Sequence, residues 1–383
     1  MNDMKTPAGI YIHIPFCAVK CMYCDFYSIA DREDSIPRFV NAITTEIEKC
    51  EIDTSDWEID TIFIGGGTPS LLKSKYIESI LKSLQTKYDL SFVSEFTIEA
   101  NPGEAPKDRL IDFRSLGINR LSMGVQSLDP DLLKFLTRIH SVEQVFETYE
   151  NARSAGFDNV NCDLIYSIPG QSWKVWEQDL NQIIDLELNH ISAYTLTLEK
   201  GTDLFKLVKE KKVRMPENEM TGEWFLKTHQ IMETNGYGSY EISNFSKSGY
   251  ECQHNLHYWR IHPYLAFGPS AHGFDGTNRW NNSRSLDQYL QQIESGNSPV
   301  SMIESLNEKD RLNELIGFGL RMNEGINLER IPENYQRQFI ENLKIAQKKW
   351  EGCFIQNKKS ISLTKIGMVY GDAIGVDLML DKD

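Results

Sequence analysis

The chain has 383 residues, of which 40% are hydrophobic, and its 55 acidic and 40 basic residues give a formal net charge of -15 at pH 7. That length exceeds the size at which a single core stops growing, so we expect more than one structural unit. The acidic excess disfavours nucleic acid as a partner, and the absence of a long apolar run or a basic-apolar N-terminus disfavours membrane spanning and export, which predicts a cytoplasmic protein.

Between residues 9 and 198 the sequence repeats a short apolar run, a Gly, Pro or Asn break and a longer segment with helical spacing. The runs predict six strands, at 9–16, 59–66, 95–102, 118–127, 159–169 and 190–198. The intervening segments predict helices, among them 37–50, 141–156 and 173–188. Repeated βα units require a parallel sheet, so residues 1–200 predict an α/β domain built as a partial (β/α)6 barrel.

After residue 200 the pattern changes. Residues 201–300 are predicted to extend the barrel, with a helix at 217–236 and a loop rich in histidine and aromatic residues from Cys252 to Phe274. Residues 301–383 predict a smaller α+β, winged-helix-like domain, with helices within 309–322 and 362–380 and a short hairpin.

Three cysteines, Cys17, Cys21 and Cys24, follow the first predicted strand. A chain with seven cysteines would contain about 0.002 C-x3-C-x2-C matches by chance, and thiols stay reduced in the cytoplasm, so a metal is a better explanation than a disulfide. Three thiolates can hold three corners of a 4Fe-4S cube, whose fourth iron then keeps an open position for a chelating amino acid. A zinc site with His13 as fourth ligand is the alternative.

The cysteine motif, followed by GGGTP at 65–69, resembles the radical S-adenosylmethionine superfamily. That resemblance implies S-adenosylmethionine on the open iron and an electron from the cluster that cleaves a carbon–sulfur bond to give a 5'-deoxyadenosyl radical. The blocks YIHIPFC, CDF, GGGTPS, IEANP, GVQS, LTRIHS, NCDLIYSIPGQ and LTKIGMVYGDAI resemble the oxygen-independent coproporphyrinogen III oxidases and the HemW-type heme chaperones.

The resemblance implies a set of residues that contact S-adenosylmethionine and assigns no catalytic residue. The set is Tyr11, Tyr23, Gly66, Gly67, Thr68, Glu99, Gln126, Arg138 and Asp163. The residue pattern agrees, because carboxylates such as Glu99 and Asp163 are costly to bury in apolar strands unless they are paired. Alternation in a strand sends Asp163 to one face and Cys162 to the other, and puts Tyr11 and His13 on one face.

Two of these residues keep a structural alternative. Tyr11 and His13 suit a pair of hydrogen-bonded core rings as well as a ligand site. Arg138 suits a salt bridge to a helix acid as well as a cofactor or substrate carboxylate.

Two departures favour the chaperone branch. Phe26 stands where the oxidases usually carry an additional cysteine, and His254–Trp259 matches the HNxxYW motif of HemW-type proteins. The resemblance therefore implies heme binding by His254, Asn255, Tyr258 and Trp259, with Arg260 near a propionate. A neutral imidazole is a good axial ligand, and His254 is the first choice. Cys252, His257, His262 and His272 are alternative ligands, and a buried aromatic cluster is the structural alternative.

The expected function is that of a heme chaperone, whose partners are heme, an acceptor protein and, if the cluster turns over, an electron donor. This reading allows transient contact with membrane-bound acceptors. Oxidative decarboxylation of coproporphyrinogen III is the enzymatic alternative, and radical chemistry on an unrelated small molecule is a third. Whether the chain is an enzyme stays open at this point.

Overall fold

The computed structural model describes residues 5–380, and its contacts group the chain into two compact units. Unit 1 contains the chain up to Pro216 together with Pro263–Glu304, and unit 2 contains Glu217–His262 and the chain from Ser305 onward. Residues 1–4, on which part of the export prediction depends, lie outside the described residues. The predicted division into domains at 1–200, 201–300 and 301–383 stays a prediction.

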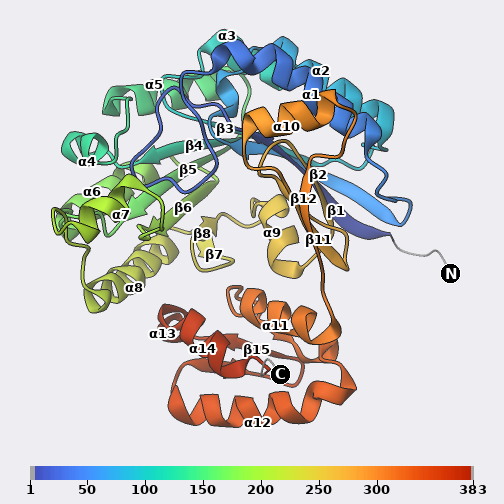
Figure 1. The fold of residues 1–383 in the computed structure, drawn as a ribbon. Helices are drawn as coiled ribbons and strands as arrows, with labels where there is room; N and C mark the ends of the chain where they lie inside the picture. Colours follow the sequence, from blue (N-terminus) through green and yellow to red (C-terminus); the bar gives the residue numbers. More distant parts are fainter. Residues whose placement is uncertain (1–4, 381–383) are drawn as a thin grey trace. The chain divides into compact units, whose positions relative to one another are not determined.

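Unit 1 is built on an open, mostly parallel sheet (Figure 1). Its strands are β1 (Thr6–Ile14), β2 (Trp57–Gly66), β3 (Glu95–Ala100), β4 (Arg120–Gln126), β5 (Asn159–Tyr166), β6 (His190–Thr195), β9 (Tyr264–Phe267), β10 (His272–Phe274), β11 (Asn278–Asn282) and β12 (Val300–Ser305). The order is β12-β11-β10-β9-β1-β2-β3-β4-β5-β6. The strands from β9 through β1 to β6 run parallel, whereas β9, β10 and β11 pair antiparallel. The predicted α/β fold with a partial barrel is confirmed.

Helices connect the parallel strands of unit 1 and cover the outer face of the sheet (Figure 1). On β1 the residues Ile10, Ile12 and Ile14 are fully buried, and Phe39 and Ile43 lie on the buried face of the first helix. Because side chains alternate along a strand, Tyr11 and His13 point to the opposite, inner face. The helices and short 3-10 turns are η1 (Glu33–Ser35), α1 (Ile36–Lys49), η2 (Pro69–Leu71), α2 (Ser74–Lys87), α3 (Lys107–Ser115), α4 (Pro130–Phe135), α5 (Val142–Ser154), α6 (Trp173–Ile184), α7 (Asp203–Lys209) and α10 (Leu286–Glu294).

The segment from Cys252 to Phe274 is not the loop that the sequence predicts. It contains the helix α9 (Gln253–Arg260) and the strands β9 and β10. β9 has only four residues, and it is stabilised by parallel pairing with β1 and by complete burial. Such a short buried strand leaves no periodic signal in the sequence, so its pairing partner decides its structure.

Unit 2 is a smaller α+β unit, as predicted for the C-terminal region. Its elements are α8 (Asn218–Thr234), β7 (Gly238–Ser239), β8 (Asn244–Ser246), α9, α11 (Glu308–Gly319), β13 (Ile326–Asn327), η3 (Leu328–Arg330), α12 (Glu333–Lys349), β14 (Phe354–Gln356), β15 (Ser360–Leu363), α13 (Lys365–Val369) and α14 (Gly371–Leu378). β13, β15 and β14 form an antiparallel sheet in that order. Across residues 5–380, no helix combines the length and the apolar composition needed to cross a bilayer.

A buried carboxylate joins sequence-distant parts of unit 1. Glu46 on α1 accepts hydrogen bonds from Gly268 N at 2.9 Å, Asn282 Nδ2 at 2.6 Å and Tyr289 Oη at 2.5 Å. Burial raises the pKa of Glu46 to about 7, although these three donors oppose the rise. A single side chain therefore ties α1 to the β9–β10 turn, to β11 and to α10.

The raised pKa of Glu46 predicts a pH dependence of stability. Folded protein holds this proton up to about pH 7, whereas the unfolded chain releases it near 4.5. The stabilisation is therefore complete below pH 4.5 and lost as the pH rises to 7, at up to about 1.4 kcal/mol per pH unit. Between pH 5 and 6.5, Glu46→Gln should remove this contribution to the pH dependence of the unfolding free energy, as measured by urea denaturation. Glu48→Gln, an exposed carboxylate on the same helix, is the control, and an unchanged slope in Glu46→Gln would contradict the assignment.

Candidate functional site

The cysteine loop leaves the carboxyl end of β1 and is closed at its base by backbone hydrogen bonds. Cys17 N donates to Ile29 O at 2.9 Å, and Ile29 N donates to Pro15 O at 2.8 Å. Cys17, Cys21 and Cys24 are half-buried free thiols within this loop. Chemistry in parallel barrels collects at this end of the strands, so the loop lies where a reactive group is expected.

The donor geometry argues against a single zinc ion. Within residues 5–380, no three His, Cys, Asp or Glu side chains converge closely enough to hold one metal ion. His13, the alternative fourth ligand, has Nδ1 3.0 Å from Tyr11 Oη and Nε2 2.8 Å from Tyr27 O, so both ring nitrogens already have partners. In a 4Fe-4S cube each thiolate binds a separate iron, so the three thiols need not converge on one ion.

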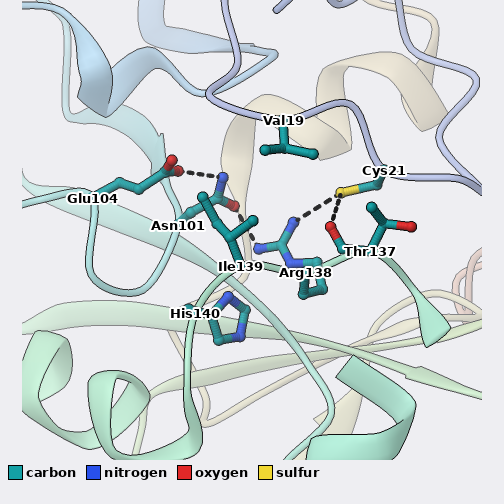
Figure 2. Close-up of a pocket in the computed structure, with 8 residues that line it drawn as sticks. All are labelled: Val19, Cys21, Asn101, Glu104, Thr137, Arg138, Ile139 and His140. Atoms are coloured by element: carbon teal, nitrogen blue, oxygen red, sulfur yellow. Dashed lines mark hydrogen bonds between the residues drawn. The ribbon is translucent and has the colours of Figure 1, made fainter. Parts of the chain in front are cut away.

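A chain of hydrogen bonds joins two of the three thiols. Thr68 Oγ1 donates to Cys17 Sγ at 3.6 Å, and Asn101 Nδ2 donates to Thr68 Oγ1 at 2.9 Å. Arg138 completes the chain, since its Nη2 donates to Asn101 Oδ1 at 2.6 Å and its Nη1 to Cys21 Sγ at 3.6 Å, as Figure 2 shows. Donors to cluster sulfurs tune reduction potentials, so this Thr68–Asn101–Arg138 chain can position and tune such a cluster.

Asn101 and Glu104 are site residues to which sequence reasoning gave no role. Glu104 Oε2 accepts from Asn101 Nδ2 at 2.6 Å, and both side chains line the pocket drawn in Figure 2. The only signal in the sequence was the position of Asn101 directly after a strand. Its contacts to Thr68, after β2, and to Arg138, between α4 and α5, join segments far apart in the sequence and required the structure.

The glycine turn after β2 is laid against the cysteine loop. Gly67 N donates to Ile14 O at 2.7 Å, and Thr68 N donates to Phe16 O at 2.7 Å. A Cβ at Gly67 would lie 2.6 Å from Phe16 O and 3.0 Å from Cys17 Sγ. Gly66 has φ +114 and its Cβ would meet the His13 ring at 2.6 Å, so neither position has room for a side chain.

Two carboxylates, Glu99 and Asp163, lie on the inner face of the sheet. Glu99 Oε2 accepts from Gly66 N at 2.9 Å, and burial together with the neighbouring Asp163 charge raises the pKa of Glu99 to about 7. Asp163 accepts from Asn161 Nδ2 at 2.9 Å and from Ser122 Oγ at 3.1 Å, and burial raises its pKa as well. A positively charged ligand would stabilise both carboxylates in their ionised form.

A buried guanidinium partly compensates the negative charge of these two carboxylates. The sequence did not single out this residue. Arg120 on β4 is 2% exposed, and its charge opposes the rise in the pKa of Glu99 and of Asp163. It also acts with burial to lower the pKa of His190. The inner face of β3, β4 and β5 therefore carries a charged network rather than an apolar core.

The other predicted S-adenosylmethionine residues also lie in unit 1. At the end of β4, Gln126 has φ +69, and its Nε2 lies 3.0 Å from a Cβ built on Gly124. Asn101 Oδ1 and Arg138 Nη2 lie 3.2 and 3.3 Å from the same point, so these three side chains converge over Gly124. Burial raises the pKa of Tyr11 and of Tyr23, and in the case of Tyr23 the nearby Arg138 charge opposes the rise.

The predicted heme residues lie on α9 in unit 2. His254 is fully buried, with Nε2 2.8 Å from Tyr258 Oη. Trp259 meets Phe318 edge-to-face at 5.9 Å between centroids, and the Arg321 guanidinium lies 4.7 Å from the Trp259 ring centre.

Two further residues of α9, Asn255 and Arg260, were also predicted to contact heme. Asn255 is half-buried, and Arg260, expected near a propionate, donates to Glu324 Oε1 at 2.7 Å. The heme assignment of this helix stays a prediction, and its first-choice ligand, His254, is fully buried in this structure.

The residues of unit 1 fit the cofactors that the sequence resemblance implies. Gly66 and Gly67 let the turn after β2 pack directly against His13 and the cysteine loop. Glu99 and Asp163 suit a cationic sulfonium nucleotide. Arg138 Nε is buried and has no hydrogen-bond partner among residues 5–380. An unsatisfied buried donor of this kind is suited to an anionic group such as a carboxylate.

Two parts of the chain match known families. Residues 11–183 match the radical SAM superfamily, and residues 306–370 match the HemN C-terminal domain. The first match contains the cysteine loop, the glycine turn and both carboxylates.

Relatives with similar sequences match between 70% and 98% of this chain. The heme chaperone HemW of Bacillus subtilis is 33% identical over 95% of this chain and 97% of its own length. The heme chaperone HemW of Escherichia coli is 38% identical over 70% of each chain. A protein of Danio rerio named radical S-adenosyl methionine domain-containing protein 1, mitochondrial, is 33% identical over 98% of this chain and 87% of its own.

Among solved structures, the coproporphyrinogen III oxidase HemN of Escherichia coli matches with a TM-score of 0.84. It is 23% identical and the match covers 98% of this chain and 90% of that chain. At this identity the match establishes the fold.

Proposed function

Because the chain belongs to the HemW family of the radical S-adenosylmethionine superfamily, we propose that it binds heme and delivers it to an acceptor protein. The observation that carries the proposal is the 33% identity with a heme chaperone over almost the full length of both chains. The family implies a 4Fe-4S cluster and S-adenosylmethionine, which we assign to the site in unit 1. The acceptor, an electron donor and the cytoplasmic location belong to the same proposal.

In this proposal Cys17, Cys21 and Cys24 hold the cluster, which supplies electrons to S-adenosylmethionine when both are bound. Thr68 and Arg138 donate to the thiol sulfurs and orient the loop. The glycine turn excludes side chains and keeps polar backbone groups close to the ligand. Glu99 and Asp163 favour its positive charge, and the unsatisfied Nε of Arg138 favours its carboxylate.

Heme binding by α9 would require His254 to exchange its hydrogen bond with Tyr258 for a bond to iron. Tyr258 lies one helical turn after His254, so its hydroxyl competes directly with the iron for Nε2. Trp259 packs against Phe318, and the Arg321 guanidinium lies over its ring, so both contacts restrict how this ring could meet a macrocycle. The motif therefore implies a ligand that is released from a hydrogen bond as heme binds.

Hemin titration of the anaerobically reconstituted chain tests this role. We expect His254→Ala to weaken the Soret shift, and Tyr258→Phe, which removes the competing hydroxyl, to tighten binding about fivefold, the equivalent of one hydrogen bond. Gln253→Ala on the same helix is the control. Equal hemin binding by His254→Ala and the unaltered chain would remove His254 from the site.

The oxidase alternative is supported by the fold but not favoured by the relatives' names or by Phe26. An anaerobic assay with coproporphyrinogen III and S-adenosylmethionine is expected to yield no protoporphyrinogen. Formation of that product at a steady rate would replace the chaperone proposal with the enzymatic one.

A further inference from the structure

The eight histidines of the chain differ sharply in accessibility. His13, His140, His190, His229, His254 and His257 are buried. His262 is half-buried and its Nδ1 lies 3.0 Å from His257 Nδ1. Only His272 is exposed, and among residues 5–380 no hydrogen bond reaches its ring. An imidazole can bind the iron of an incoming heme only if the iron can reach a ring nitrogen, so His272 meets this condition without rearrangement.

His272 stands on a rigid support in unit 1. It begins β10 and pairs with Asn281 of β11 in an antiparallel hairpin. The hairpin is anchored by Asn282, whose Nδ2 donates to the buried Glu46 at 2.6 Å and to Gly268 O at 2.9 Å. A ligand fixed in this way loses little conformational entropy when it binds iron.

Two guanidinium groups flank this imidazole. Partial burial lowers the pKa of His272, and the charges of Arg279 and Arg284 lower it further. The ring is therefore neutral near pH 7, the form that coordinates iron. Arg284 is 63% exposed, and its Nη2 donates to Asp25 O at 3.1 Å. Since a guanidinium has five N–H donors, Arg284 can still bind a propionate.

An exposed aromatic residue follows the residue that Arg284 contacts. Phe26 is 71% exposed and directly follows Asp25, the residue that Arg284 contacts. An exposed phenylalanine offers a flat apolar surface, which is the surface that a macrocycle buries. The charge of Arg284 acts on the imidazole of the hairpin, and its hydrogen bond reaches the residue before Phe26 in the cysteine loop. All three residues belong to unit 1.

We propose that His272 is an axial ligand of heme iron, with Arg284 binding a heme propionate and Phe26 covering part of the macrocycle. This site is separate from the α9 motif and rests on the proposed heme-binding function. The site combines three groups that suit heme: an imidazole for the iron, a cation for a propionate and an apolar surface for the macrocycle.

The test titrates the full-length reconstituted chain with hemin and, separately, with iron-free protoporphyrin IX. His272→Ala should weaken hemin binding at least tenfold and alter the Soret band, yet leave porphyrin binding unchanged, because only iron contacts the imidazole. His272→Met should restore hemin binding with a different spectrum, since the thioether is also an axial ligand. Arg284→Gln should weaken both probes, and Arg284→Lys less so.

Thr277→Ala on the exposed turn of the same hairpin and Arg38→Gln, an exposed arginine on α1, are the matched controls. Iron content and thermal unfolding of each variant establish that the cluster and the fold are intact. Hemin binding by His272→Ala with the affinity and spectrum of the unaltered chain would overturn the His272 site alone. No hemin binding by the unaltered chain would overturn the proposed function and this site together.

Discussion

Replacing Cys17, Cys21 and Cys24 together with alanine is expected to lower the iron retained after anaerobic reconstitution at least tenfold. The protein would bind three irons of the cube only through these thiolates, and the methyl group of alanine cannot bind iron. The loop itself should persist, because backbone bonds between Cys17 and Ile29 and between Ile29 and Pro15 close its base. The free energy of unfolding of the metal-free chain should change by about 1 kcal/mol or less.

Iron and acid-labile sulfide analysis, together with the visible absorption of the cluster, measures this effect. Cys50→Ala removes a half-buried thiol outside the loop and should keep the full iron content. Retention of iron by the triple variant, or its loss in Cys50→Ala, would place the metal elsewhere in the chain.

Gly67→Ala is expected to damage both the fold and the cluster site. The added methyl would lie 2.6 Å from Phe16 O and 3.0 Å from Ile14 O, which are backbone atoms that no rotamer change can move. Relief requires the turn to withdraw from the cysteine loop and weakens the bond of Gly67 N to Ile14 O. We expect a loss of about 1–3 kcal/mol in unfolding free energy and at least a threefold loss of bound iron.

Urea unfolding of the metal-free chain and iron analysis after reconstitution separate the two effects. Gly375→Ala is a matched control, because its methyl would meet only Leu320 Cδ1 at 3.9 Å and α14 should gain about 0.5–1 kcal/mol from the better helix former. The two substitutions add the same group and should change stability in opposite directions. A Gly67→Ala chain as stable and as iron-rich as the unaltered protein would remove the steric argument.

The parallel strands could be predicted because each combines β-branched residues with a clear break. β1 illustrates this, since Ile10, Ile12 and Ile14 alternate with Tyr11 and His13 in the sequence and separate onto two faces in the structure. β9 could not be predicted, because its four residues become a strand only by pairing with β1, which lies some 250 residues earlier. Local patterns carry no information on such distant pairing.

The candidate site also contains residues that the sequence could identify and contacts that it could not. Glu99 and Asp163 were recognisable as carboxylates inside apolar strands, and the structure places both on the inner face of the sheet. The link of Asn101 to Arg138 and the capping of His13 by Tyr27 O depend on side-chain contacts between separate strands and loops. The exposure of His272 depends on how the β10–β11 hairpin packs, which sequence periodicity does not measure.

The discontinuity of unit 1 has a consequence for protein synthesis. The cysteine loop leaves the ribosome early, but Arg32 bonds to Asp287, Tyr27 Oη accepts from Leu286 N and Glu46 bonds to Asn282, all from the segment 263–304. A nascent chain shorter than about 260 residues also exposes the edge of β1 that β9 later covers. The cysteine loop therefore stays incompletely braced until roughly three quarters of the polypeptide has been translated.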